Sequence, residues 1–432
     1  MRYSNRLKFI VVFLVLITVG IIVYQIPWVN QRLAWRFDIA QTYLRGIVQP
    51  AGGVPTSKPN SRSEIVPTII PIRPTTSPLP STSTATPSYT ARGETDSQEQ
   101  IPSALPTQEV TPTFIPESVT LPPPEWEKQD WNNCGPATLS MYLNYYGWEG
   151  DQFDVSSVLK PTREDRNVNV EELVYFSRNY AGWLHTEYRV GGDINLLKKF
   201  IAAEIPVMIE ATFTFEGAYW PNDDLWAAHY LLITAYDDLQ GKFTVQDSFH
   251  GPNQIINYQT LDKNWYPFNR VYILIYTASQ EDVVKGLLGS AWDEVHNREQ
   301  TLEDSRKEVA ENPKDAFSWF NLGTNLIYFE QYQDAAEAYD QARSIGWPQR
   351  MLRYQFGPFF AYFHSGRTED LLALTEYALQ RTPNSEEALL WHGWALYRQG
   401  DILGASEDFQ AALKANYRYQ DAQYALDYIS GR

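Results

Sequence analysis

The chain contains very little cysteine: Cys134 is the single cysteine among 432 residues. A disulfide framework needs cysteines in pairs, so the composition excludes a bridge within the chain. A zinc site of the finger type needs several cysteine or histidine ligands at short spacings, and it is excluded for the same reason. Three roles remain for Cys134: a small buried hydrophobic side chain, a disulfide to another molecule, or a nucleophile.

Positive charge is also scarce, because 35 lysines and arginines stand against 52 aspartates and glutamates, a formal net charge of −17. Nucleic-acid binding depends on clustered basic side chains, so we expect no nucleic-acid partner. The sequence has no G-x-x-x-x-G-K-[ST] motif, so we expect no phosphate-cradling loop of the kind found in nucleotide hydrolases. We expect neither a cofactor nor a metal ion.

One long hydrophobic run lies near the N-terminus. Residues 9–26 contain no acidic or basic residue, and at 1.5 Å per residue a helix of this run is about 27 Å long, close to the roughly 30 Å of bilayer hydrocarbon. A signal peptide is the alternative, because basic residues precede the run, but no A-x-A-like cleavage site follows it. We predict a cytoplasmic tail over residues 1–8, a transmembrane anchor over residues 9–26 and a juxtamembrane segment over residues 27–49.

The next region, residues 50–124, holds 16 of the 27 prolines and is rich in serine and threonine. Such a composition buries too little apolar surface to offset the entropy of the chain, and its prolines favour extended conformations. We therefore predict a linker between a membrane anchor and a folded body outside the cytoplasmic membrane. About 300 residues follow this linker, which is enough for two domains.

Cys134 lies at the start of a predicted helix. Pro136 suits the first turn, where the missing N–H costs nothing. Apolar side chains then recur at helical spacing until Gly147 supplies a stop, namely Leu139, Tyr142, Leu143 and Tyr146. Unpaired N–H groups and the positive end of the helix dipole stabilise a thiolate here, which lowers the thiol pKa below its free value of roughly 8.5. The local pattern favours the nucleophile over the buried side chain.

The base for this thiol must come from six histidines. His229 precedes an apolar run over residues 230–236 that is typical of a buried strand, and a second predicted strand ends at Asp247. If these strands are antiparallel neighbours, Asp247 lies beside His229 and orients its ring, as in acyl-transfer enzymes. The alternatives are a buried core histidine at His229 and a turn-capping role for Asp247, and His250 is a rival base in a predicted loop.

Four stretches together resemble the C39-like papain-fold cysteine peptidases, relatives of the bacteriocin-processing double-glycine peptidases. They are CGPATLSMYLNYYG, IPVMIEATF, HYLLITAYDD and VQDS, and the resemblance covers residues 126–276. It implies an α+β papain-like fold in which Cys134 is the nucleophile, His229 the general base and Asp247 the group that orients the imidazole. It also implies that the amide of Gln129 and the backbone N–H of Cys134 stabilise the oxyanion.

Two neighbours of Cys134 are alternative amide donors. Asn132 and Asn133 also carry side-chain amides, although capping the helix start is their simpler role. No ATP-driven transporter region accompanies the domain, so the leader-peptide substrates of the transporter-linked relatives are not carried over. The identity of the substrate stays open.

After Thr277 the pattern is helical throughout and resembles tetratricopeptide repeats. Small and large residues of three units match the repeat, namely Trp319, Leu322, Gly323, Ala335, Tyr339 and Ala342; Tyr362, Ala378 and Pro383; and Leu389, Gly393, Ala405, Phe409 and Ala412. Each such repeat contacts only its neighbours, so we expect an array that folds independently and has a concave face for a peptide or protein. The acidic excess over residues 280–432, 24 acidic against 14 basic residues, fits a solvated exterior or an acidic groove.

The sequence therefore predicts an α+β papain-like cysteine peptidase domain over residues 125–279 and an all-α tetratricopeptide solenoid over residues 280–432. The predicted function is a membrane-anchored, extracytoplasmic cysteine peptidase that acts through a Cys-His-Asp triad. Its expected partners are a peptide or protein substrate, a protein bound by the repeats, and the membrane. Acyl transfer to an amine and a non-catalytic binding or scaffold protein are the alternatives.

Overall fold

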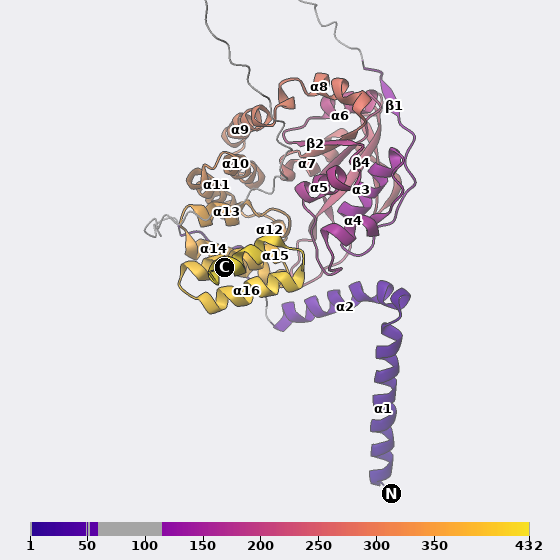
Figure 1. Ribbon diagram of the computed structural model, residues 1–432, viewed down its shortest axis with the longest axis vertical. Coiled ribbons are helices and arrows are strands. Elements are labelled where there is room, and N and C mark those ends of the chain that lie inside the picture. The colour runs from indigo at the N-terminus through magenta and orange to yellow at the C-terminus, as the bar shows by residue number, and fades with distance from the viewer. Residues whose placement is uncertain (1, 49, 51, 59–114, 432) are drawn as a thin grey trace, which may run out of the picture. The chain divides into compact units, whose positions relative to one another are not determined.

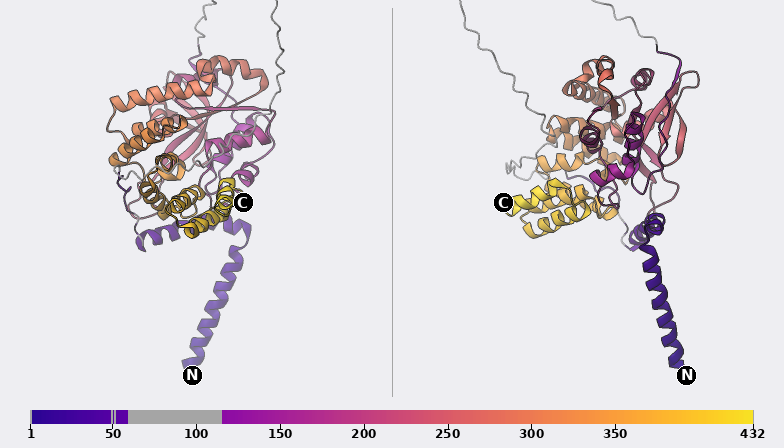
Figure 2. Two further views of the ribbon diagram at one scale, coloured as in Figure 1. Left: turned by 60° about the vertical axis from the view of Figure 1, so that its left-hand side comes forward. Right: turned by 45° about the vertical axis from the view of Figure 1, so that its right-hand side comes forward.

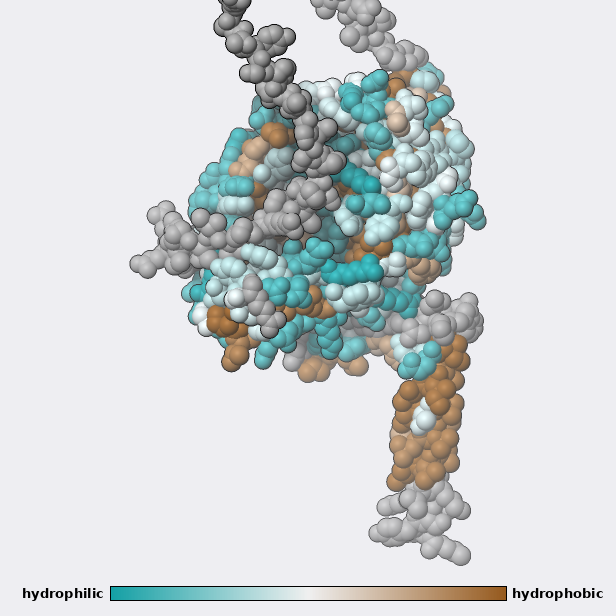
Figure 3. All heavy atoms as spheres, viewed as in Figure 1, coloured by the Kyte–Doolittle hydropathy of each residue, from teal (hydrophilic) through white to brown (hydrophobic). Residues whose placement is uncertain are grey.

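The computed structural model describes residues 2–48, 50, 52–58 and 115–431 (Figure 1). Its N-terminal part consists of helices α1 (Arg2–Tyr24) and α2 (Pro27–Val48). From Ile10 onward the side chains of α1 are mostly apolar and exposed, as the brown surface in Figure 3 shows. Among the described residues, no helix is both long and apolar enough to cross a membrane. The anchor over residues 9–26 stays a prediction.

Within the described residues, seven strands form one sheet with the order β2-β7-β3-β4-β5-β6, and β1 pairs with β4. Every pairing is antiparallel. The central strand β4 contains the apolar run of residues 230–236, and the second predicted strand is β5, so both strand predictions are confirmed. The bounds are β1 (Ser118–Thr120), β2 (His185–Arg189), β3 (Val207–Thr214), β4 (Trp226–Asp237), β5 (Lys242–Asp247), β6 (Gly251–Asn257) and β7 (Tyr272–Tyr276).

Helices cover both faces of this sheet. One hydrophobic core joins the sheet to α3 (Cys134–Tyr145), α4 (Gln152–Leu159) and α5 (Val170–Tyr180). A second core joins it to α6 (Ile194–Ala202), α7 (Tyr258–Trp265) and α8 (Glu281–Leu288). Three short turns of 3₁₀ helix adjoin α7 and α8, namely η1 (Tyr266–Phe268), η2 (Ala278–Gln280) and η3 (Gly289–Trp292). Side chains of a strand alternate between its faces, so Leu232 enters the first core and Ile233 the second. Burial on both faces explains why the sequence of β4 is an unbroken apolar run.

The predicted linker of residues 50–124 extends too far toward the C-terminus, because the folded domain begins before residue 124. Residues 118–120 lie within the range predicted as linker, yet they form β1 and pair with the end of β4. Leu121, which follows, is only 4% exposed and belongs to the second core. A strand of three residues between prolines carries too weak a pattern to be recognised in the sequence. The predicted linker residues 59–114 lie outside the described part of the chain.

The C-terminal region is helical, and Figure 2 shows its helices in orange to yellow. Gly323 faces the ring of Tyr339, where an added Cβ would lie 2.7 Å from the ring, and Gly393 faces Phe409 in the same way at 2.6 Å. This close packing is consistent with the predicted repeats, whose assignment stays a prediction. The bounds are α9 (Glu294–Glu311), α10 (Ala316–Tyr328), α11 (Tyr332–Ile345), α12 (Met351–Tyr354), α13 (Gly357–His364), α14 (Thr368–Arg381), α15 (Glu386–Arg398), α16 (Ile402–Ala415) and α17 (Gln420–Ile429).

Buried polar contacts join the helical region to the papain-like domain. Arg350 pairs with Asp223 at 2.6 Å between Nη2 and Oδ2, and both side chains are 0% exposed. The buried Asn269 donates from Nδ2 to Oδ1 of Asn325 at 2.7 Å. The expectation that each repeat contacts only its neighbours is therefore wrong for Asn325 and Arg350. Long-range packing of this kind leaves no local pattern in the sequence.

Candidate active site

Cys134 is the first residue of α3, directly after Asn133. The predicted position at a helix start is confirmed, and the thiol lies among the unpaired N–H groups at the positive end of the helix. The next nine residues of the helix are buried, but Cys134 itself is partly exposed. The residue is therefore only partly covered, while the helix that carries it is fixed by the core.

His229 and Asp247 lie side by side, as predicted from the two strands. His229 Nε2 is 2.8 Å from Asp247 Oδ1, and the two residues are only 3% and 6% exposed. The carboxylate occupies Nε2, so Nδ1 is the ring nitrogen left for Cys134, and the ring and the thiol shift each other's pKa. The structure thus brings these three predicted residues together in the order thiol, imidazole, carboxylate.

The charges of this group support one another. Burial raises the pKa of the Cys134 thiol, but the hydrogen bond and charge of His229, the backbone of Tyr230 and the charge of Lys160 together lower it below its ordinary value. Burial lowers the pKa of His229, and its bonds to Asp247 and Cys134 outweigh this and raise it to about 9. The site therefore favours a thiolate beside an imidazolium.

Asp247 is held from several sides. Its Oδ1 also accepts the backbone N–H groups of Phe249 at 2.8 Å and His250 at 2.9 Å. Its Oδ2 lies 2.7 Å from Nδ1 of His250, which was the rival base in the sequence. Burial raises the pKa of Asp247, but its bonds to His229 and His250 hold it well below the usual range. The carboxylate is charged and fixed, and His250 contacts it on the side away from His229.

Gln129 is held by the loop that follows β5. Its side-chain Oε1 accepts the hydroxyl of Ser248 at 2.9 Å, and its backbone N–H donates to the Ser248 carbonyl at 2.9 Å. Because the amide oxygen is occupied by a donor, the NH₂ end is the end that remains for another acceptor. Ser248 gave no signal in the sequence, because its role depends on bringing together residues more than a hundred positions apart.

The two neighbouring asparagines differ in their contacts. Asn133 donates from Nδ2 to Oε1 of Gln152 at 2.8 Å, so its amide supports the start of α4. Asn132 has a φ of +54°, a left-handed backbone that asparagine tolerates, and its Nδ2 is buried with no hydrogen-bond partner among the described residues. An unsatisfied amide donor beside Cys134 is free to bind an oxygen atom at this position.

Residues 119–273 match the Peptidase_C39 like family. This match confirms the resemblance drawn from the sequence, and the matched residues include Cys134, His229 and Asp247. No curated protein sequence matches the chain.

Several solved structures share parts of the chain. A Bacillus anthracis protein described as a C39-like peptidase is 17% identical, covering 37% of this chain and 98% of that one, with a TM-score of 0.30. A double glycine motif protease from an AMS/PCAT transporter, solved with its leader peptide, is 16% identical, covering 37% and 95%, with a TM-score of 0.28. YrrB, a TPR protein with an unusual peptide-binding site, is 15% identical, covering 34% and 95%, with a TM-score of 0.18. The roles of the site residues rest on their own geometry.

One residue beside the thiol of the C39-like domain was missed in the sequence. A cavity of about 10 Å³, room for one water molecule, adjoins Cys134 and is lined by Glu210 of β3 and by Tyr354 of the helical region. Glu210 is 4% exposed, and burial, with the negative charge of Cys134, raises its pKa well above the usual range. A single acidic residue inside the apolar stretch IPVMIEATF was the signal that could have found it.

Proposed function

We propose that the chain is a cysteine peptidase in which Cys134 attacks a peptide carbonyl. The observation that supports this most is the 2.8 Å contact of Asp247 with Nε2 of His229, which leaves the other ring nitrogen for the thiol. A carboxylate that fixes the imidazole and an imidazole that bonds the thiol are the parts that nucleophilic acyl transfer requires.

In the proposed reaction the Cys134 sulfur forms a bond to the carbonyl carbon, and the negative charge moves to the carbonyl oxygen. The backbone N–H of Cys134 and a side-chain amide stabilise that charge, and Gln129 and Asn132 are the two amides with an NH₂ group for it. The C–N bond then breaks as His229 gives its proton to the leaving amine. Water attacks the thioester, His229 takes a proton from it, and the thiolate is released with the acid.

We assign the helical region a role in substrate recruitment. Tyr354 lines the cavity next to Cys134 although it belongs to α12, so a peptide at the site would contact both parts of the chain. The buried pair of Arg350 and Asp223 fixes this arrangement. The proposed substrate is a peptide or protein that contacts the helical region as well as the thiol.

The chemistry is tested with a peptidyl epoxide and a mixture of internally quenched peptides. Because the chain has one cysteine, intact mass should show a single adduct at Cys134 in the folded protein, and labelling should stop peptide cleavage. Reaction only after unfolding would contradict the peptidase and favour the binding protein. If the epoxide labels Cys134 but the unlabelled protein transfers the acyl group of a peptide to an added amine instead of hydrolysing it, the function is that of a transferase and not of a peptidase.

In the same proposal residues 9–26 anchor the chain and the folded parts lie outside the cytoplasmic membrane. This part rests on the uncharged run and on the exposed apolar side chains of α1. Protease added to intact cells should release a soluble fragment that contains both folded parts, because a sequence rich in proline, serine and threonine is the expected site of cleavage. Protection of the helical region until lysis would contradict this orientation.

A further inference from the structure

Residues 52–58 form neither helix nor strand, yet side chains of the helical region bind their backbone. The carbonyl of Pro55 accepts two N–H bonds from the guanidinium of Arg343, at 2.9 Å from Nε and 2.7 Å from Nη2. The carbonyl of Gly52 accepts Nη2 of Arg381 at 2.8 Å. Two arginines from α11 and α14 thus hold two carbonyls of a segment that precedes them by 288 and 329 positions.

The third contact engages an N–H group. The backbone N–H of Lys58 donates to Oδ1 of Asp370 at 3.0 Å, and its side chain forms an exposed ion pair with Glu369. The bound backbone groups belong to residues 52, 55 and 58, every third position of the segment. The segment bends at Gly53 and forms no helix or strand, so its backbone groups are available to a partner.

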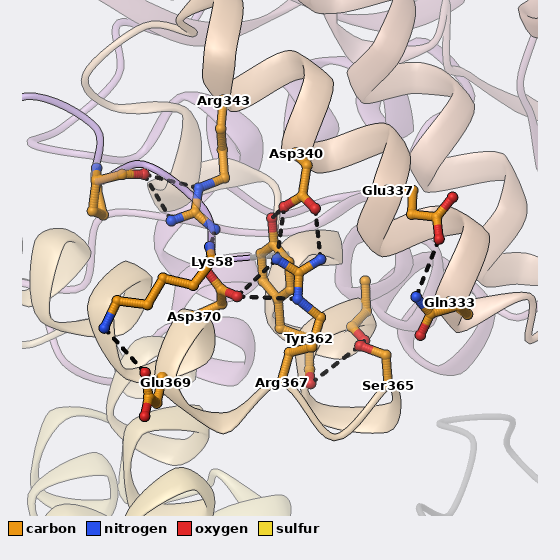
Figure 4. A network of polar contacts seen from close by, with 12 residues as sticks. Lys58, Gln333, Glu337, Asp340, Arg343, Tyr362, Ser365, Arg367, Glu369 and Asp370 are labelled. Carbon is orange, nitrogen blue, oxygen red and sulfur yellow. Dashed lines mark hydrogen bonds and ion pairs between the residues drawn. The ribbon is translucent and has the colours of Figure 1, made fainter. Parts of the chain in front are cut away.

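The groups that receive the segment are fixed before it binds. Figure 4 shows Arg343 paired with Asp370 at 3.0 Å, and these side chains are 0% and 1% exposed. Arg367 connects Asp370, at 2.7 Å, to Asp340, at 2.6 Å, and the hydroxyl of Tyr362 donates to Asp340 at 2.8 Å. Arg343, Arg367, Asp340 and Asp370 each have a partner of opposite sign, so the guanidinium of Arg343 and the carboxylate of Asp370 present their remaining bonding positions without rearrangement.

We propose that α11, α13 and α14 carry a docking site for the backbone of a proline-containing peptide, and that residues 52–58 of this chain occupy it. Arg343 and Arg381 bind carbonyl groups and Asp370 binds an N–H group, so the site recognises the peptide backbone more than its side chains. The start of the proline-rich region is thereby fastened to the helical region. The site is separate from Cys134 and does not depend on the proposed peptidase activity.

The test uses a fluorescein-labelled peptide of residues 50–60 and the full chain with Cys134→Ala, which prevents cleavage. The chain's own segment competes at an effective concentration in the millimolar range. A second chain also carries Lys58→Pro, which removes the N–H donor of the resident segment at an exposed position. Fluorescence anisotropy should show that the labelled peptide binds the Lys58→Pro chain at least about tenfold more tightly than the chain with Cys134→Ala alone. The reason is that the resident segment, which competes with the peptide, has lost its hydrogen bond to the charged Asp370.

Two further peptides separate backbone recognition from charge. A peptide with Lys58→Ala should bind within about threefold of the parent, because an exposed ion pair contributes little. A peptide with a methyl group on the backbone nitrogen of Lys58 should bind at least about tenfold more weakly, since it keeps the side chain and loses the donor. Equal binding of the methylated peptide, or loss of binding with Lys58→Ala, would overturn the proposal. Arg381→Met should weaken binding as well, and if that variant does not fold, the peptide comparison alone decides.

Discussion

Replacing His229 by alanine is expected to raise the pKa of the Cys134 thiol above its ordinary value. Burial alone raises that pKa, and the hydrogen bond and charge of His229 are the two largest causes that lower it. Their loss leaves burial dominant, so the thiolate should be scarce at neutral pH. Peptide hydrolysis should fall by about 10²- to 10⁴-fold, because the leaving amine also loses its proton donor.

The measurement is the rate of iodoacetamide alkylation of Cys134 against pH. Below about pH 9, the raised pKa of His229, its ring carries a proton and stabilises the thiolate. Wild-type alkylation should therefore begin at a lower pH than that of a free thiol, whereas in His229→Ala it should begin at a higher one. His250→Ala is the matched control, because it keeps the backbone N–H bond to Oδ1 of Asp247 and removes only a ring that contacts Oδ2. An alkylation profile unchanged by His229→Ala would show that the ring does not act on the sulfur.

The parts of this site that were predicted from the sequence are those with local patterns. Pro136, the helical spacing of apolar residues and Gly147 placed Cys134 at a helix start, and the structure has α3 beginning at that residue. The apolar run of β4 and the alternating run of β5 placed His229 and Asp247 at neighbouring ends, because a strand pattern specifies both its ends and its faces. Short-range periodicity was sufficient for the three side chains.

The remaining features depend on contacts that no local pattern contains. Asn132 stands out only through its left-handed backbone and its unsatisfied amide, and Glu210 only through burial beside the thiol. The contact of Pro55 with Arg343 joins positions 288 residues apart. Each of these features arises when distant elements pack, and the free energy that selects them is spread over many residues.

Asp247→Asn is expected to slow peptide hydrolysis while leaving the geometry of the site intact. Oδ1 of Asp247 accepts His229 and the backbone N–H groups of Phe249 and His250, and an asparagine Oδ1 can accept all three bonds. The substitution therefore removes the negative charge but keeps the groups in place. A thermal midpoint close to that of the wild type should verify that the fold is retained.

The loss of charge acts through His229. Bonding to Asp247 and Cys134 raises the pKa of His229 to about 9 against the opposing effect of burial, and Asp247 is the largest of the raising causes. With a neutral amide in its place, burial lowers the pKa of the ring, so the imidazolium that exists up to about pH 9 in the wild type is lost at a lower pH. The alkaline limb of the hydrolysis profile should move toward acid, and hydrolysis at pH 8 should fall by about 10²-fold or more.

Asp237→Asn is the matched control for this profile, because Asp237 is at the other end of β4, where its Oδ1 accepts the backbone N–H of Gln240 in an exposed turn. Asp237→Asn removes one negative charge from β4, the strand of His229, without changing a contact of His229. The alkaline limb of its hydrolysis profile should therefore coincide with that of the wild type. An unchanged limb in Asp247→Asn would mean that the raised pKa of His229 comes from Cys134 alone. A shifted limb in both variants would mean that net charge, rather than the contact at 2.8 Å, sets the protonation of the ring. Only a shift confined to Asp247→Asn supports a carboxylate that keeps His229 protonated for the leaving amine.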